Sequence, residues 1–226
     1  MNRASRSPAT GLGPGRSARQ AVLAARDYQK DGKRWVVDLD LASFFDEVNH
    51  DLLMARVRRK VRDVRMLKLM RSFLNSGVMA GGVTQPTEKG TPQGGPLSPL
   101  LSNVLLDVLD KELEKRGHRF CRYADDCNIY VGSRRGGERL MDSITRFLEG
   151  DMKLKVNREK SAVARPVTRI FLGYSFAAHK EAKIRVPEKT CMKMRAKLKL
   201  CFRQGKGRNV ERFIRDTLNP LLRGWM

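Results

Sequence analysis

Apolar and polar residues alternate along this chain with two different periods, which together predict a protein of both helices and strands. Helices are predicted where apolar residues return every three or four positions: residues 17–28, one or two helices over 50–75, 100–116, 137–150 and a basic stretch from about 189 to the end. Strands are predicted where β-branched and apolar residues alternate or cluster: residues 35–41, 119–124, 127–131, 153–156, 161–164 and 169–176.

The boundaries between these elements also follow from particular residues. Ser17 is a candidate N-cap, the helical region 50–75 is expected to be joined near Asp63, and the glycine-rich residues 77–83 indicate a short hairpin. The order of elements favours an α+β fold, in which an antiparallel sheet is backed by helices on one face. A domain boundary is expected near Pro187.

The charge of the chain points to a polyanionic partner. Of its 226 residues, 46 are lysine or arginine and 24 are acidic, a net charge of +22, while a hydrophobic content of 41% indicates a globular protein. Nucleic acid is the leading candidate, although ribosomal-type basic proteins share such a charge. An anionic membrane surface is the rival, but no segment has the apolar length of a membrane span.

The cysteines and histidines do not indicate a zinc site. No two of the four cysteines form a C-x-x-C pair, and the three histidines are scattered. Reduced, mostly packed thiols are therefore expected, as in a protein of the bacterial cytoplasm.

Two acidic elements carry the candidate chemistry. Asp125 and Asp126 lie between two predicted strands, where a tight hairpin could bring both carboxylates together around a hard divalent cation such as Mg²⁺. An Asp-Asp pair in a turn is more often only a turn. Asp38 and Asp40 are two apart on another predicted strand and so share a face. A strand carboxylate beside a hairpin pair is the framework of a two-metal polymerase site.

Five segments in order resemble motifs A to E of reverse transcriptases, and their detail is most similar to bacterial group II intron-encoded proteins. The segments are DLASFFDEVNHDLL, GTPQGGPLSPLLSN, RYADD, LKVNREKS and FLGYSF. GPGRSARQAV resembles the end of that family's fingers region, and LNPLLRGW resembles the start of its thumb, or maturase domain. The resemblance implies residues 1–33 as a fingers remnant, 34–187 as the palm of a right-hand polymerase and 188–226 as the start of a helical thumb.

The resemblance also implies metal ligands and a substrate site. The family's motif A aspartate lies five residues before an aromatic residue, and Asp40 and Phe45 have that spacing. The resemblance therefore implies that Asp40, Asp125 and Asp126 would bind two Mg²⁺ or Mn²⁺ ions, with the Leu41 carbonyl nearby and Asp38 as second choice. Phe45 would be the gate that excludes ribonucleotides, unless it only packs in the core beside Phe44.

Further assignments carried over from the family concern the nucleotide, the primer and nucleic acid. Gln93 and Gly94 of the Gly/Pro loop, with Tyr123, would contact the nucleotide or template, although such a loop can be an ordinary turn. Lys160 would protonate the leaving pyrophosphate, and Phe171, Leu172, Gly173 and Tyr174 would form the primer grip. Contacts with nucleic acid are expected from the basic residues of the last region: Lys193, Lys197, Arg203, Lys206, Arg208, Arg212 and Arg215.

The sequence leaves several readings of function open. The first is an RNA-directed DNA polymerase that uses an RNA template, a DNA primer and deoxynucleoside triphosphates. The others are a non-catalytic maturase remnant that binds intron RNA, and an inert fragment. The family's fingers stretch before Gly13 is not matched, so a missing segment or a partner protein is expected to supply it. Retron and defence-type enzymes share the YADD motif, whereas RNA-dependent RNA polymerases typically have glycine before the Asp pair.

Overall fold

The computed structural model describes residues 17–76, 89–90, 97–177 and 182–224, and the backbone of 78–80 and 83–85. Contacts between residues divide the chain into two compact units, residues 1–184 and 185–226. The division lies three residues before Pro187. Each unit has its own packing and is described separately.

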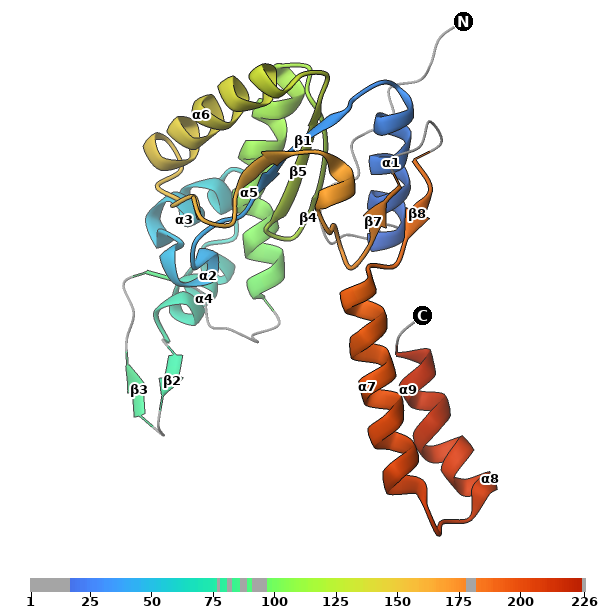
Figure 1. The fold of residues 1–226 in the computed structure, drawn as a ribbon. Helices are drawn as coiled ribbons and strands as arrows, with labels where there is room; N and C mark the ends of the chain where they lie inside the picture. Colours follow the sequence, from blue (N-terminus) through green and yellow to red (C-terminus); the bar gives the residue numbers. More distant parts are fainter. Residues whose placement is uncertain are drawn as a thin grey trace, which may run out of the picture. The chain divides into compact units, whose positions relative to one another are not determined.

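Unit 1 is built on a four-stranded antiparallel sheet with the strand order β4-β5-β1-β6 (Figure 1). Its strands are β1 (Trp35–Leu39), β4 (Arg119–Tyr123), β5 (Asp126–Val131) and β6 (Ala162–Ala164). Val36, Val37 and Leu39 of β1 are all buried, because this strand has a neighbour on each side and side chains packed on both faces. The sheet confirms the predicted α+β class.

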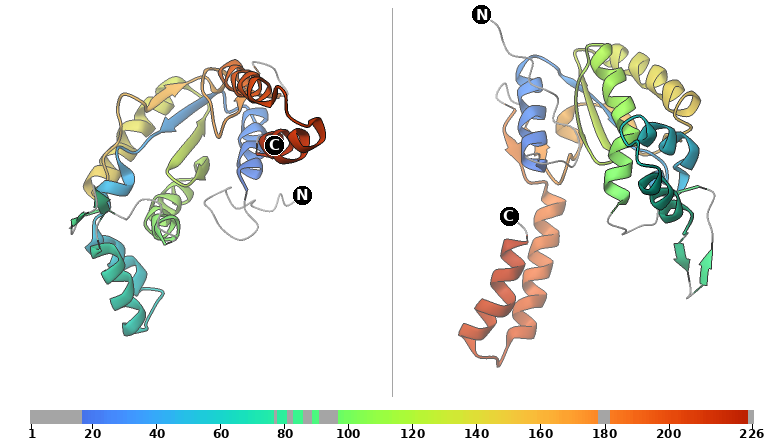
Figure 2. Two further views of the ribbon diagram at one scale, coloured as in Figure 1. Left: turned by 90° about the horizontal axis from the view of Figure 1, so that it is seen from below. Right: turned by 180° about the vertical axis from the view of Figure 1, so that it is seen from behind.

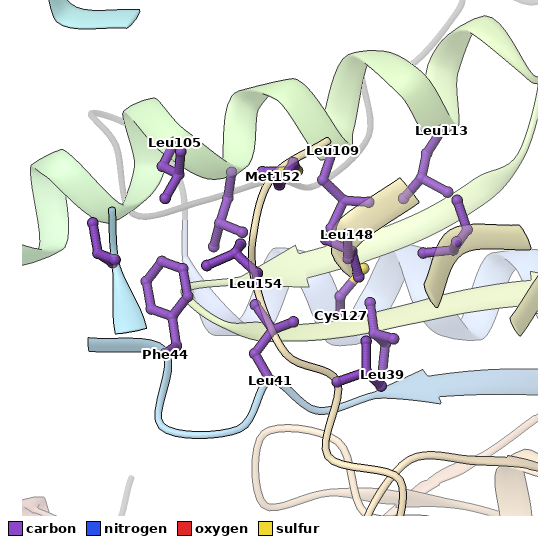
Figure 3. Close-up of a cluster of buried hydrophobic side chains, with 14 of the residues drawn as sticks. Leu39, Leu41, Phe44, Leu105, Leu109, Leu113, Cys127, Leu148, Met152 and Leu154 are labelled. Carbon is purple, nitrogen blue, oxygen red and sulfur yellow. The ribbon is translucent and has the colours of Figure 1, made fainter. Parts of the chain in front are cut away.

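Helices packed on the first face of this sheet and on one another form the main core. They are α2 (Phe44–Glu47), α3 (His50–Arg58), α4 (Val64–Asn75), α5 (Ser98–Lys115) and α6 (Arg134–Gly150). Leucines of α5 and α6 meet Leu39 and Cys127 of the sheet (Figure 3). Asp63 joins α3 to α4 and caps α4, because its carboxylate accepts the Arg65 and Met66 amides at 2.8 and 3.1 Å. The predicted joint in 50–75 is thereby confirmed.

A helix also covers the second face of the sheet, which the sequence pattern did not predict. Helix α1 (Ala18–Lys30) begins with a capping box formed by Ser17 and Gln20, so the predicted N-cap is correct. Ala21, Val22 and Ala25 of α1 pack against the sheet residues Val36, Cys121 and Tyr130 and against Phe171 and Phe176. Strands β7 (Ser175–Phe176) and β8 (Ile184–Arg185) pair beside this cluster.

Two predicted strands are not formed as expected. Residues 153–156 meet their neighbour only in a bridge between Val156 and Leu41, and Lys153, with a left-handed φ of 56°, is not extended. In 169–176 only the last two residues form a strand, and a tight turn precedes them. The predicted hairpin at 77–83 is present as β2 (Val78–Ala80) paired with β3 (Val83–Gln85).

Unit 2 is a helical hairpin (Figure 2). It contains α7 (Glu188–Gly205), α8 (Val210–Phe213), a π-helical stretch (Ile214–Leu218) and α9 (Asn219–Arg223). The rings of Phe202 and Phe213 pack with their centroids 5.9 Å apart, and a Cβ on Gly205 would stand 2.5 Å from the Phe213 ring. Gly205 thus lets the two arms approach. Among the described residues, no helix is long and apolar enough to cross a membrane.

Gly137 sets how closely α6 approaches the sheet. A Cβ at this position would stand 2.6 Å from Cγ1 of Val163 and 3.3 Å from Cγ2 of Val131. We expect Gly137→Ala to destabilise the fold by about 1 kcal/mol. Overpacking costs about 1–3 kcal/mol, and the higher helix propensity of alanine offsets up to about 1 kcal/mol of that cost. Gly150→Ala is the control, since its Cβ would meet no atom within 4 Å. Equal urea-unfolding midpoints for the two variants would contradict this close approach.

Candidate active site

The turn of the β4–β5 hairpin carries the first candidate carboxylate. Tyr123 is paired with Asp126, so the two-residue loop consists of Ala124 and Asp125 rather than of Asp125 and Asp126. The loop lies one residue earlier than the predicted strands implied. Ala124 has a φ of 55°, a conformation that costs a non-glycine residue energy. Asp125 therefore stands in the turn and Asp126 opens β5.

Asp40 directly follows the central strand β1, where the sheet ladder has ended. Its amide donates to Oγ of Ser161 at 3.0 Å, and its carbonyl accepts the Asn157 amide at 2.9 Å. Residues 157–161 thus anchor the Asp40 backbone at the end of the sheet. The Asp40 side chain remains half-exposed.

Asp38, two residues earlier, already has a cationic partner. Nε of Arg169 donates to the Asp38 carboxylate at 2.6 Å, and the same guanidinium donates to the Lys160 carbonyl at 2.6 Å. Burial raises the pKa of the Asp38 carboxyl, Arg169 opposes this rise, and the charge of Asp40 adds to it. Asp38 is therefore charge-paired, whereas Asp40 forms no ion pair with any of the described residues.

The four carboxylates repel one another across the ends of β1 and β5. The pKa of Asp126 is raised to about 6, first because the surrounding strand ends partly desolvate it, and then by the charges of Asp125, Asp38 and Asp40. Its side chain remains open to solvent. Within the described ranges, no three His, Cys, Asp or Glu side chains are grouped closely enough to enclose a metal ion. The carboxylates are hard oxygen donors, and their repulsion would be relieved by a divalent cation.

This repulsion predicts a pH dependence of stability. Because the pKa of Asp126 is higher in the folded state, about 6, than its ordinary value of 3.8, folding is favoured by protonation. Its contribution is present below pH 3.8, declines as the pH rises to about 6 and is lost above that pH. We expect thermal unfolding in EDTA to show a steeper decline over this pH range in the wild-type chain than in Asp126→Asn, in which Asp38, whose pKa is also raised, still titrates. Parallel curves for the two proteins would contradict the raised pKa.

A buried ion pair lies beneath the β4–β5 turn, and the sequence analysis missed it. Arg122 is 2% exposed and Asp110 of α5 is 6% exposed. Nε of Arg122 donates to Oδ1 of Asp110 at 2.7 Å, and Nη1 donates to the Ala124 carbonyl at 2.8 Å and to Oδ1 of Asn103 at 3.1 Å. Asn103 and Asp110 are seven residues apart and so share one face of α5. That spacing, with an arginine directly before Tyr123, was the available signal.

The two phenylalanines after Asp40 have different environments. Phe44 is buried in the core, while Phe45 is half-buried at its edge, with the two ring centroids 5.3 Å apart. Leu41 is also buried, and its backbone forms the bridge to Val156. The structure thus gives core packing to Phe44 and leaves part of the Phe45 ring accessible.

The start of the Gly/Pro loop packs on the segment that follows Asp40. Gly90 has a φ of 91°, and a Cβ there would stand 2.9 Å from the Phe45 carbonyl oxygen. The Gly90 amide donates to the Val48 carbonyl at 2.8 Å, and Nε2 of His50 meets the Gly90 carbonyl. This glycine permits approach to the protein's own backbone. Gln93 and Gly94 lie outside the described residues.

Residues 171–174, the expected primer grip, form a tight turn. The amides of Phe171 and Tyr174 donate to each other's carbonyls at 2.8 and 3.0 Å, and the two central residues have positive φ, 50° at Leu172 and 82° at Gly173. Phe171 is buried against α1, while Gly173 is exposed. Lys160 is exposed, and its carbonyl is held by Arg169.

The residues expected to contact nucleic acid all lie on unit 2. All seven side chains are exposed: Lys193, Lys197, Arg203, Lys206, Arg208, Arg212 and Arg215. Arg212 and Arg215 share Asp216 as an ion-pair partner.

Comparison with known proteins identifies the family. The sequence pattern described as "Reverse transcriptase (RNA-dependent DNA polymerase)" matches residues 3–176, which include the sheet and the four carboxylates. The chain is 31% identical over 191 residues to protein YkfC of Escherichia coli, covering 68% of this chain and 50% of YkfC. It is 38% identical over 101 residues to the group II intron-encoded protein LtrA of Lactococcus lactis, covering 45% of this chain and 17% of LtrA. The chain thus spans half or less of these relatives.

Solved structures show the same fold at low sequence identity. Telomerase from Candida albicans superposes with a TM-score of 0.59 at 13% identity, covering 95% of this chain and 42% of the telomerase chain. A truncated telomerase from Candida tropicalis gives a TM-score of 0.58 at 14% identity, over 80% of this chain and 41% of that one. The motif order, the sheet and these matches agree, and the chain belongs to the reverse transcriptase family, with group II intron-encoded proteins among its relatives.

Proposed function

We propose that this chain carries the palm of an RNA-directed DNA polymerase of the group II intron type. The observation that carries the proposal is the set of four carboxylates at the ends of β1 and β5, where partial burial and then the charges of Asp125, Asp38 and Asp40 raise the pKa of Asp126. A protein gains nothing in stability from such repulsion. A site that binds divalent cations and phosphate explains why it is kept.

Asp40, Asp125 and Asp126 are the proposed ligands of two Mg²⁺ ions. Asp38 is set apart from them because Arg169 already neutralises it, so its role is to shape the local charge. Bound ions would supply Lewis acidity to the primer 3′-hydroxyl and to the leaving pyrophosphate. The protein's own contribution is to fix the direction of the carboxylates: residues 157–161 anchor Asp40, and the β4–β5 turn places Asp125.

Other residues would select and orient the nucleotide. The accessible part of the Phe45 ring is proposed to contact the sugar at C2′ and leave no room for a hydroxyl group. Phe45 is suited to this role because its ring packs against the buried Phe44 and its backbone carbonyl lies close to Gly90. Tyr123, Leu41, Gln93 and Gly94 complete the proposed substrate site.

The proton donor and the primer contact would come from the segments joined by Arg169. Lys160 is exposed on a backbone that Arg169 holds through the Lys160 carbonyl, and its ammonium group is proposed to protonate the leaving pyrophosphate. The turn formed by Phe171, Leu172, Gly173 and Tyr174 presents an exposed glycine, where a primer backbone can approach closely. The RNA template and DNA primer would also contact the basic side chains of unit 2.

Primer extension tests the proposal. The purified chain is incubated with an RNA template, a labelled DNA primer, deoxynucleoside triphosphates and Mg²⁺, beside an Asp125→Ala/Asp126→Ala double variant. Extension by the wild-type chain alone supports the proposal. A soluble, cooperatively melting wild-type chain that extends no more than the double variant would reject polymerase activity for residues 1–226.

A non-catalytic maturase that binds intron RNA is the second candidate. It is favoured by the separate helical unit 185–226, whose exposed lysines and arginines far outnumber its acids. In that case binding to structured intron RNA weakens steeply with salt and is unchanged in the Asp125→Ala/Asp126→Ala variant, while no extension occurs.

A further inference from the structure

Arg122 connects helix α5 to the turn that carries Asp125, and it does so from inside the core. Its guanidinium is almost fully buried and uses all three nitrogens: Nε and Nη2 bind the Asp110 carboxylate, and Nη1 binds the Asn103 side chain and the Ala124 carbonyl. Both partners on α5 face β4, along which α5 packs (Figure 1). The turn is thus tied to the longest helix beneath the sheet.

The turn requires such a tie. Ala124 has a left-handed φ of 55°, which strains a residue with a Cβ and persists only when the surroundings hold it. Arg122 holds this residue by donating a hydrogen bond to the Ala124 carbonyl. A sheet needs no buried ion pair for its stability, because apolar residues of similar volume often serve as well or better. The planar guanidinium of arginine, however, has donors in fixed directions and can orient the groups that it binds, which apolar packing cannot do.

We propose that Arg122 is a positioning residue, which with Asp110 and Asn103 holds Ala124 in its left-handed conformation and thereby directs the Asp125 and Asp126 carboxylates. The hold of Arg122 on Ala124 follows from the contacts described above. Its consequence for metal binding and catalysis rests on the proposed polymerase function. Because Arg122 is buried, it acts on the site through Ala124.

Arg122→Lys tests the proposal, because lysine keeps the positive charge beside Asp110 but cannot bind Asp110, Asn103 and Ala124 in one fixed plane. We expect amide hydrogen exchange in residues 123–126 to become roughly tenfold faster, the scale of one lost charge-assisted hydrogen bond. Exchange in β1 and α6 should change much less. We also expect the Mn²⁺ affinity, measured by electron paramagnetic resonance of free Mn²⁺, to fall roughly tenfold.

Leu109→Ala is the matched control, since Leu109 is buried on the same helix beside Asp110 and its loss weakens the core without touching the turn. This variant should speed exchange throughout unit 1 and leave Mn²⁺ affinity per folded molecule unchanged. If Arg122→Lys shows the same uniform exchange as Leu109→Ala, the ion pair is purely structural and the inference is overturned. The exchange measurement needs no polymerase activity, so failure of the wild-type chain to extend a primer would reject the proposed function separately.

Discussion

Asp40→Asn should reduce primer extension by about 10³-fold while leaving the fold intact. The substitution keeps the size of the side chain and removes one charged ligand from the proposed metal site, where each ion contributes several kcal/mol and each 1.36 kcal/mol changes the rate tenfold. The Asp40 backbone, which Ser161 and Asn157 hold, is not altered. Steady-state extension at saturating template, with thermal unfolding measured in parallel, checks the result.

Asp38→Asn is the matched control for this prediction. It removes a carboxylate two residues away, but one that is bound to Arg169 rather than free to take a cation. We expect a loss of about tenfold in extension, through weaker anchoring of Arg169 and of the Lys160 carbonyl that it holds. A loss equal to that of Asp40→Asn would make Asp38 a ligand and exchange the two assignments.

Phe45→Val should lower the discrimination against ribonucleotides by roughly 10- to 100-fold, the scale on which one group in a pocket changes specificity. The smaller side chain would leave space beside C2′ of the incoming sugar. The measurement is the ratio of kcat/KM for deoxyribonucleotide and ribonucleotide incorporation opposite the same template base. Incorporation of deoxyribonucleotides should fall far less than that ratio.

Phe44→Leu separates sugar selection from packing. Phe44 is 3% exposed and lies in the main core, so this substitution should lower stability and leave the discrimination ratio near that of the wild-type chain. If Phe44→Leu relaxes discrimination as much as Phe45→Val, the effect comes from a disturbed core. An unchanged ratio in Phe45→Val would remove Phe45 from the sugar site.

Most of the secondary structure could be predicted from the sequence, because the signals for it are local. Ser17 is followed at Gln20 by its capping-box partner, and Asp63 stands where the two helices of 50–75 meet. The prediction failed where a single backbone angle decided the outcome. Lys153 is left-handed at the start of one segment, and Leu172 and Gly173 form a tight turn within another, although the side chains of both segments alternate as in strands.

The candidate site could be proposed from motif order, but the ion pairing within it could not be predicted. Spacing to an aromatic residue favours Asp40 over Asp38, yet the partner that neutralises Asp38 is Arg169, 131 residues away. The aromatic pair after Asp40 was equally ambiguous, and only packing distinguishes the buried Phe44 from the accessible Phe45. No periodicity along the chain encodes a contact between segments so far apart.

By itself the sequence determined the α+β class, the order of its elements, the acidic and basic residues available and the family resemblance, because each depends on residue type and near-neighbour spacing. The tertiary structure alone decided that α1 covers the second face, that Arg122 and Asp110 form a buried pair beneath the turn, and that Gly90 serves a backbone contact. These features depend on which distant side chains are desolvated together, and burial is a property of the assembled fold.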